Sequence, residues 1–430
     1  MKLEVVLQNA QVLVNRLQHE IEEGKKNMKT AEEEILELCN RLGGLMIEEV
    51  FHGIKEPEQE NVIFVKQGKA VYKDRQVLRL LTRFGNSIER RRRRYHIDGQ
   101  GGYYPLDNLL GTDKCAGYTP LMTYLLALYG GSEPYQRGGR RLSRTIGFPV
   151  SATAVQRNTE LLGSKLARNP LEIIRDESQN KACDRMIVQI DGTMSPQIRE
   201  IEGLSGRESL KQPTEYKECN LIVIEKYDKD KLIDRWTGGC YGPRNQFEEY
   251  ARQAGMKMGF MRAREVVFIA DGAKHNWEIQ NTSFPDAHPV LDFYHVLEHL
   301  ADFCSLFKDE ASGKRQYGQW RTMLWDGDVL QVIQEMNDSL GRVRNRSEAV
   351  KHTNYFSVNK NRMDYDSYRS QGWPCGSGLV EGSCKLVVGK RFKGNGMRWR
   401  KKDNEAVLNV RLYAINDQLD DVFSPVCQVG

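Results

Sequence analysis

The stretch RMIVQIDGTMSP, from Arg185 to Pro196, places a carboxylate directly after an apolar run. The run predicts a short buried strand that ends abruptly on Asp191, Gly192 and Thr193. A carboxylate in this position can hold a metal ion, attack a phosphate or cap a turn. A lone Asp-Gly pair most often forms a turn, so the role of Asp191 depends on the residues that join it.

A second stretch, EVVFIADGA, ends on Asp271 in the same way. Two such strands side by side would bring both carboxylates to the carboxyl edge of a sheet, where sites form in α/β folds. Glu381, in GWPCGSGLVEGSCK, lies at the predicted start of a helix and is a third candidate. Carboxylates without cysteine partners favour Mg²⁺ or Mn²⁺, and two such ions suit phosphodiester chemistry.

Length and composition indicate a multidomain globular protein. The chain has 430 residues, of which 40% are hydrophobic and 28% charged, and we expect about two to four domains. No apolar run approaches the roughly 20 residues of a membrane span, so no membrane association is expected. The N-terminal residues do not resemble a signal peptide. The nine cysteines are scattered without a CxxC pair, which favours a reducing cytoplasm and no zinc ribbon.

Basic residues are clustered although the net charge is only +5. Arg90, Arg91, Arg92, Arg93 and Arg94 are consecutive, and residues 385–402 contain eight Lys or Arg without an acid. One such block is often a solvated face, but two favour a polyanion such as nucleic acid. Alternation would place Arg91 and Arg93 on one face of a strand and the other three on the opposite face.

The segment before Arg185 predicts helices, then a small sheet, then a helix-turn-helix. Residues 2–50 have helical periodicity and could form a hairpin, an oligomer contact or simple packing. Residues 61–98 predict β-hairpins. In residues 135–163, Gly147 would turn the chain between two helices and Ser151 would cap the second. Its first residues would face DNA bases. The basic candidates for DNA contact in this region are Arg140, Arg141, Arg144 and Arg157.

From Met186 onward the pattern is α/β, with five predicted strands and a mostly helical segment at 308–365. The motif IDGT also resembles part of the Asp-x-Asp-Gly-Thr motif of haloacid-dehalogenase-like phosphatases. In that family the first Asp is the nucleophile, but Gln189 occupies its position here. An amide cannot attack phosphate, so this family is a remote alternative.

The ordered set Asp191, Asp271 and Glu381 resembles the DDE transposases, most of all the Kra-type group of bacterial insertion sequences and, more distantly, the Mutator-like enzymes. The resemblance covers residues 186–415. Its motifs are IDGTM, YKECN, ADGAKHNW, DFYHVLEHL, GWPCGSGLVEGSCK, GKRFKGNGMRW and AVLNVRLYAIN. It implies a ribonuclease-H-like domain, in which helices flank a mixed five-stranded sheet, and the long gap before Glu381 implies a helical insertion.

The resemblance also implies roles for individual residues. Asp191 would bridge two metal ions at the end of the first strand, while Asp271, after the fourth strand, and Glu381 would each hold one. Asp292 and His295 match the D-x-x-H element of Mutator-like enzymes. His299, one helical turn beyond His295, could support the site, contact DNA or simply pack.

Basic residues follow Glu381 and would grip the scissile backbone, while one aromatic residue among them could stack on an unpaired base or belong to the core. These candidates are Lys385, Lys390, Arg391, Lys393, Arg398 and Trp399. Many members of the group carry a cysteine-bearing knuckle near RRYHIDGQGGYYPLD. This sequence has no cysteine there, so structural zinc is not expected.

The sequence therefore predicts a DNA transposase that cuts transposon ends and transfers the 3′ hydroxyl strand to target DNA. Its partners would be double-stranded DNA, namely terminal inverted repeats and target, and a second copy, because paired ends imply at least a dimer. A domesticated DNA-binding relative and a structure-specific nuclease stay open. A bacterial cytoplasm, near the nucleoid, is the expected location. The predicted ranges are 1–58 helical, 59–175 DNA-binding, 180–307 catalytic, 308–370 insertion and 371–430 catalytic.

Overall fold

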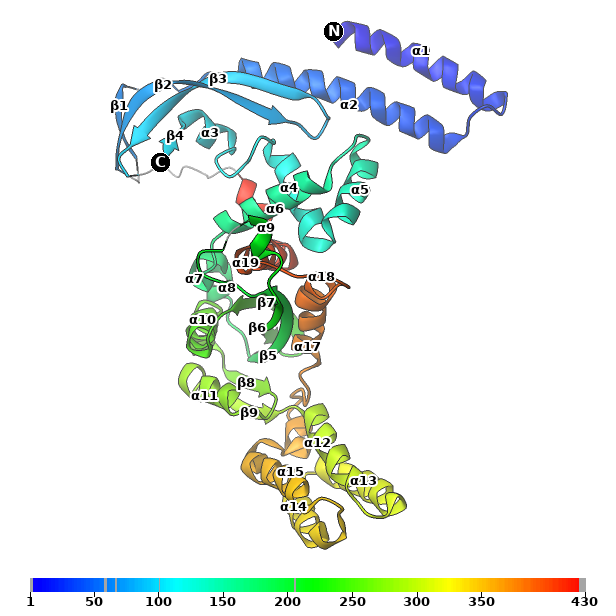
Figure 1. Ribbon diagram of the computed structural model, residues 1–430, viewed down its shortest axis with the longest axis vertical. Coiled ribbons are helices and arrows are strands. Elements are labelled where there is room, and N and C mark those ends of the chain that lie inside the picture. The colour runs from blue at the N-terminus through cyan, green and yellow to red at the C-terminus, as the bar shows by residue number, and fades with distance from the viewer. Residues whose placement is uncertain (1–2, 58–59, 66–67, 100, 205, 425–430) are drawn as a thin grey trace. The chain divides into compact units, whose positions relative to one another are not determined.

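The computed structural model describes residues 3–57, 60–65, 68–99, 101–204 and 206–424 (Figure 1). Its contacts divide the chain into two compact units. The first unit contains residues 1–166 and 405–430, and the second contains residues 167–404. The five predicted domain ranges stay a prediction, since the units divide the chain more coarsely.

The first unit begins with a helical hairpin, one of the arrangements predicted for residues 2–50. Helix α1 (Leu3–Glu22) is followed by α2 (Met28–Gly53). The side chain of Asn27 caps α2 by accepting the backbone N–H of Thr30 at 3.1 Å. This cap gives a hydrogen-bond acceptor to one of the N–H groups in the first turn of α2 that have no partner within the helix.

An antiparallel sheet follows, in the order β1-β2-β3-β4. Its strands are β1 (Val62–Val65), β2 (Gly68–Leu81), β3 (Ser87–Ile97) and β4 (Gly102–Tyr103). The arginine run lies within β3, whose two ends bury opposite faces. Ile88 packs with Phe51 at one end, whereas Tyr95 and Ile97 are buried at the other. The arginines occupy the part of the strand where the buried face changes.

The predicted helix-turn-helix is present in the first unit. After α3 (Pro105–Leu110), helices α4 (Pro120–Ser132), α5 (Tyr135–Ile146) and α6 (Ala152–Lys165) pack on one another. Gly147 ends α5 with a φ of +83°, which only glycine adopts at little cost. Ser151 caps α6 by accepting the N–H of Ala154 at 3.1 Å. Gly147 therefore ends α5 and Ser151 caps α6, as the sequence predicts.

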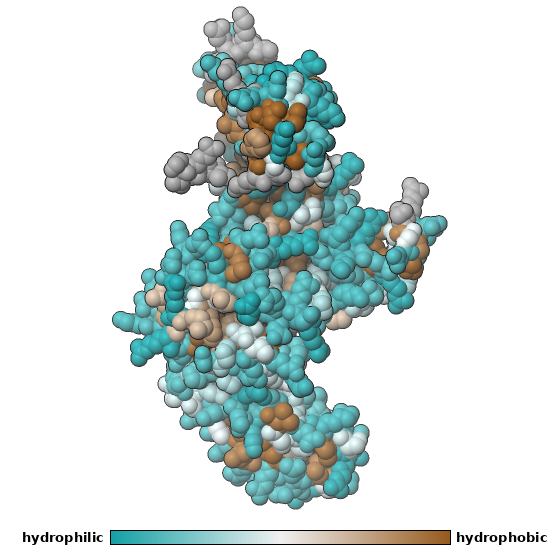
Figure 2. Space-filling model, turned by 90° about the vertical axis from the view of Figure 1, so that its left-hand side faces the viewer, coloured by the Kyte–Doolittle hydropathy of each residue, from teal (hydrophilic) through white to brown (hydrophobic). Residues whose placement is uncertain are grey.

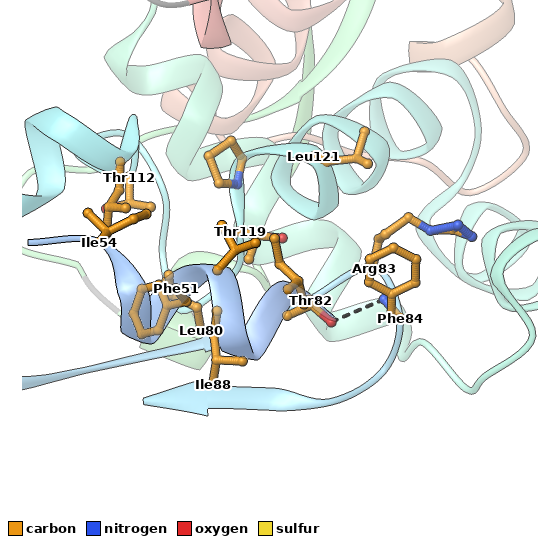
Figure 3. A pocket seen from close by; sticks show the side chains of 14 residues that line it. Phe51, Ile54, Leu80, Thr82, Arg83, Phe84, Ile88, Thr112, Thr119 and Leu121 are labelled. Carbon is orange, nitrogen blue, oxygen red and sulfur yellow. Dashed lines mark hydrogen bonds between the residues drawn. The ribbon is translucent and has the colours of Figure 1, made fainter. Parts of the chain in front are cut away.

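A pocket of about 310 Å³ lies in the first unit between α2, the β2–β3 hairpin and the start of α4 (Figure 3). Its lining is almost wholly apolar and includes Phe51, Leu80, Ile88 and Leu121. The hydrogen bond drawn in Figure 3 runs from the N–H of Phe84 to the hydroxyl of Thr82, at 3.1 Å. None of the residues predicted for the catalytic site lines this pocket.

The second unit is built on a mixed five-stranded sheet in the order β7-β6-β5-β8-β9. Its central strand pairs antiparallel with β6 and parallel with β8. The strands are β5 (Arg185–Ile198), β6 (Thr214–Asp228), β7 (Lys231–Tyr241), β8 (Glu265–Ala270) and β9 (His288–Leu291). The predicted five strands are confirmed, with the first, fourth and fifth parallel.

The expectation that the first strand ends on Asp191 is wrong. Strand β5 continues to Ile198, because β6 pairs with it along its whole length. Gly192 pairs with Asn220 and forms no turn. A Cβ on Gly192 would lie only 2.6 Å from a carboxylate oxygen of Glu218. The glycine therefore leaves room for a neighbouring side chain of the sheet.

Helices surround this sheet, and the predicted helical insertion is present. The helices before the insertion are α7 (Pro170–Ile173), α8 (Asp176–Asn180), α9 (Gly206–Ser209), α10 (Arg244–Lys257), η1 (Phe260–Arg262), α11 (Lys274–Ser283) and α12 (Phe293–Ser305). The insertion contains α13 (Glu310–Trp325), α14 (Val329–Asp338), η2 (Ser339–Arg342), α15 (Arg346–Asn359), η3 (Lys360–Arg362) and α16 (Tyr365–Ser370). Sheet and insertion share one hydrophobic core.

The chain then returns to the sheet and ends in the first unit. Helix α17 (Gly378–Cys384) widens into a π-helical turn, η4 (Lys385–Gly389), before α18 (Lys390–Phe392). Helix α19 (Lys401–Ile415) and η5 (Asp421–Phe423) follow. In the first unit, Val410 and Leu419 pack with Ala127, Leu162 and Leu166.

The face shown in Figure 2 is mainly hydrophilic, with separate apolar areas. Among the described residues, no helix combines the length and the apolar character that a membrane crossing needs.

Candidate active site

Asp191, on β5, and Asp271, directly after β8, occupy equivalent positions along two neighbouring parallel strands. The last recorded pair between β5 and β8 joins Gln189 to Ile269, and each aspartate follows two residues later. Adjacent strands run about 4.8 Å apart, so the two residues are neighbours across the sheet. Burial raises the pKa of Asp191, and the charge of Asp271 raises it further, against the opposing effects of Cys384 and the Gly192 N–H. The negative charges are thus crowded.

Asp271 is held by the start of the helix that follows it. Its Oδ1 accepts the N–H of Ala273 at 2.9 Å and the side-chain amide of Asn276 at 2.7 Å. Asn276 is buried on α11. These two donors fix one carboxylate oxygen of Asp271.

Glu381 lies in the first turn of α17, which packs against β5 and β6. The side chain of Gln189, on β5, accepts the N–H of Val380 at 3.1 Å. Because Gln189 is only 3% exposed, this bond ties the start of α17 to the strand that carries Asp191. The Glu381 side chain is about 31% exposed, so it remains accessible from solvent.

A buried carboxylate, Asp292, links β9 and α12 to the loop before Glu381. One of its oxygens accepts the N–H groups of Tyr294 and His295, and the other accepts the N–H and the hydroxyl of Ser377. The Ser377 hydroxyl also lies 3.3 Å from Glu381. Both oxygens of Asp292 are therefore occupied, which suits a residue that positions others.

His295 lies between these carboxylates. Its Nδ1 is 3.6 Å from Asp292, and the ligand atoms of Asp292, His295 and Glu381 all lie within 4.8 Å of one another. The Asp292 carboxylate raises the pKa of His295 to about 9, and the charge of Asp271 contributes. For Asp292 itself, burial raises the pKa, but His295 and Ser377 outweigh it and leave the pKa lowered. The predicted Asp292–His295 pair thus meets Glu381.

Among the described residues, the ligand atoms that gather within 4.8 Å of one another are those of Asp292, His295 and Glu381, and the three predicted carboxylates do not form such a group. The residue types nevertheless suit a hard divalent cation. Asp191, Asp271 and Glu381 supply carboxylate oxygens, the ligands that Mg²⁺ and Mn²⁺ prefer. Burial is the main cause of the raised pKa of Asp191, and the charge of Asp271 adds to it; a bound cation would favour the ionised carboxylate. Gln189 occupies the position that holds the nucleophilic Asp in haloacid-dehalogenase-like phosphatases. Its side chain accepts the N–H of Val380 on α17, so it has a structural role here.

His299 is one turn beyond His295 and packs against the insertion. Its ring stacks on Tyr355 at 3.7 Å between centroids, and its Nδ1 lies 3.1 Å from Nδ1 of His352. Burial lowers the pKa of His299. Of its predicted roles, the structure favours packing that joins α12 to α15.

Some of the predicted basic residues after Glu381 are near the carboxylates. Lys393 donates to the hydroxyl of Thr193 at 2.6 Å, two residues beyond Asp191. Lys385 lies 3.6 Å from Glu381, and Lys390 is exposed. Arg398 is also exposed but donates to backbone carbonyls of the loop before β6.

Arg391 and Trp399 require a correction. They are 1% and 6% exposed, and the Arg391 guanidinium lies 4.6 Å from the centre of the Trp399 ring. The Trp399 indole N–H donates to the carbonyl of Phe392 at 3.2 Å. Both side chains are part of the packed interior, so neither presents a surface on which DNA could lie.

The arginine run of β3 is largely engaged within the first unit. Arg90 donates to the carbonyls of Phe51 and Ile54 at the end of α2. Arg92 pairs with Asp107 and Arg94 with Asp74. Arg93 lies over the ring of Tyr72. Arg91 is exposed.

The predicted basic residues of the helix-turn-helix face solvent. Arg140, Arg144 and Arg157 are exposed on α5 and α6. Arg141 is exposed too but pairs with Glu133. On α6, Thr153 and Gln156 join Arg157 on the exposed side of its first turns. This surface keeps the character predicted for a DNA contact.

Four residues of the site were not predicted as such: Gln189, Asn276, Tyr355 and Ser377. A signal exists for Gln189, since a lone amide inside an apolar strand needs a buried partner. Ser377 and Asn276 lie in polar stretches where nothing singles them out. Tyr355 belongs to a distant helix, and its place beside Gly272 is a tertiary contact.

Comparison with known proteins adds little. No family model matches the chain, and no curated protein matches it. Five solved chains are similar at the level of structure. They include the Drosophila P element transposase strand transfer complex, with 12% identity over 71% of this chain and 81% of that chain, and a TM-score of 0.28. A score this low supports no conclusion about fold or activity.

Proposed function

We propose that this protein is a metal-dependent DNA transposase with a ribonuclease-H-like catalytic domain. The observation that carries the proposal is the register of β5 and β8, which sets Asp191 beside Asp271. Helix α17, which packs against β5 and β6, carries Glu381 in its first turn. First strand, fourth strand and late helix are the positions that the DDE family resemblance assigns to these carboxylates.

Asp191, Asp271 and Glu381 would hold two Mg²⁺ or Mn²⁺ ions. When bound, such ions activate an attacking oxygen and stabilise the leaving one in phosphodiester chemistry. Other residues of the chain would hold these carboxylates in position. Gln189 and Ser377 fix the start of α17, and Asn276 fixes Asp271.

The DNA would enter through basic side chains of both units. Lys393 and Lys385 lie beside the carboxylates and suit the scissile phosphate. The exposed side of α6 suits base edges of the terminal inverted repeats. Pairing of two ends implies at least two copies of the chain on DNA.

The test is a cleavage assay with Mg²⁺ on duplexes that carry the inverted repeats flanking the gene. Substitution of Asp191→Asn, Asp271→Asn or Glu381→Gln keeps shape and removes one charge. Each should lower cleavage by more than about 100-fold, because direct ligands cost more than outer-shell partners. Glu278→Gln, at an exposed acid paired with Lys274 on α11, is the matched control and should cut like the parent.

The assay also separates the other possibilities. Binding without cleavage by the parent protein at any Mg²⁺ or Mn²⁺ concentration would identify a domesticated DNA-binding relative. Cleavage without joining of the 3′ end to target DNA would identify a structure-specific nuclease. Full activity in the three charge-neutral variants would overturn the assignment of the site.

A further inference from the structure

The helical insertion reaches the catalytic carboxylates through one side chain, Tyr355 on α15. Its ring lies against the backbone of Gly272, directly after Asp271. A Cβ on Gly272 would overlap the ring and would lie 2.6 Å from the tyrosine hydroxyl. Glycine is therefore required at position 272 by the approach of Tyr355, and not by an unusual backbone angle.

The tyrosine ring is also covered by a histidine. His299, on α12, stacks on it with a centroid distance of 3.7 Å and an angle of 20°. His352, one turn before Tyr355 on α15, lies 3.1 Å from His299, Nδ1 to Nδ1. The Tyr355 side chain thus contacts both His299 and the backbone at Gly272.

Asp271 has little freedom in this arrangement. The N–H of Ala273 and the side-chain amide of Asn276 both donate to its Oδ1. Tyr355, from the insertion, packs against the backbone of the next residue, Gly272. The remaining oxygen, Oδ2, is left with a defined direction. A ligand held in this way needs less ordering when a cation binds.

We propose that Tyr355 is a positioning residue: the insertion uses it, backed by His299, to fix Asp271 for cation binding. This inference rests on the proposed function, because it assigns Asp271 a role as ligand. It makes the insertion a structural part of the catalytic site, although Tyr355 contributes no ligand itself.

A merely structural tyrosine would have different consequences. Loss of core packing lowers stability wherever it occurs, whereas loss of positioning weakens cation binding even in a folded protein. Phe356, the next residue on α15, is fully buried in the same core. Its substitution therefore separates the two effects.

The experiment uses the full chain and measures Mn²⁺ binding by electron paramagnetic resonance. Tyr355→Ala should raise the dissociation constant for Mn²⁺ about 10- to 100-fold, as loss of an outer-shell partner commonly does. Gly272→Ala should do the same, because its methyl group displaces the ring. Tyr355→Phe keeps the stacked ring and should retain most of the affinity. Phe356→Leu should lower the melting temperature but leave Mn²⁺ binding unchanged.

Hydrogen exchange of residues 271–273 supplies a readout that needs no metal. Tyr355→Ala and Gly272→Ala should speed exchange there, and Phe356→Leu should not do so selectively. Unchanged exchange and Mn²⁺ affinity in Tyr355→Ala, or equal losses in Phe356→Leu, would overturn the inference. A parent protein that binds no Mn²⁺ would refute the proposed metal site, and exchange would then decide the positioning role by itself.

Discussion

At the scale of single residues, Gln189 connects β5, which carries Asp191, to α17, which carries Glu381. Replacing it by leucine removes the acceptor for the Val380 N–H and should destabilise the second unit by about 1–3 kcal/mol. Cleavage should fall as well, because the start of α17 is released. Urea unfolding and the cleavage assay measure the two effects.

Gln197→Leu provides the matched control for Gln189→Leu. Gln197 lies on the same strand and is equally buried, at 3% exposure, but its side-chain nitrogen has no partner among the described residues. Its replacement should cost little stability. An equal loss in both variants would show that burial of the amide, and not its bond to α17, determines the effect.

The residues also show what a sequence can and cannot predict about the site. Asp191 and Asp271 could be proposed from local patterns, because each follows an apolar run and precedes a glycine. Glu381 has no such mark, and its assignment depends on the family resemblance. The order of Arg391 and Trp399 among basic residues resembles a nucleic-acid surface, yet both are buried. Which side of a short segment faces inward depends on the rest of the fold.

At the scale of elements, most arginines of β3 make contacts within the first unit, and one is exposed to solvent. Arg91 is the exposed member of the run. We expect Arg91→Ala to weaken DNA binding and to reduce the salt dependence by about one phosphate contact. Fluorescence anisotropy at several salt concentrations measures both quantities.

Arg79→Ala is the control on the neighbouring strand. Arg79 is exposed but pairs with Glu89 at 2.6 Å, so its positive charge is already balanced. Its loss should change the salt slope less than the loss of Arg91. Equal slopes for both variants and the parent would exclude this sheet from the DNA contact.

Elements were predictable where their ends are marked locally. Ser151 and Gly147 set the limits of α6 and α5 by capping and by left-handed geometry. The end of β5 has no such mark, since its extension to Ile198 follows from pairing with β6. A long-range partner therefore overrides the turn that Asp-Gly favours.

At the scale of the whole molecule, the chain returns to the first unit after completing the second. The described residues 405–424 belong to the first unit, although they follow the second unit in the chain. There α19 lies close to α6, with Asn409 donating to the carbonyl of Gly163 at 3.0 Å. The packing of α19 on α6 could not be predicted, because it depends on a glycine, Gly163, that lets the two helix backbones approach closely.

Gly163→Ala tests the packing of α19 on α6. A Cβ at position 163 would overlap the backbone of Ala406, so we expect a loss of about 1–3 kcal/mol from overpacking. Gly318→Ala, on α13 with no atom within 4 Å of the new Cβ, should instead stabilise by about 0.5–1 kcal/mol. Hydrogen exchange should show faster opening of α4 and α6 in Gly163→Ala, with β5 to β9 unchanged. Faster opening of that sheet would contradict the division into two units, because the strain at Gly163 would then spread beyond the first.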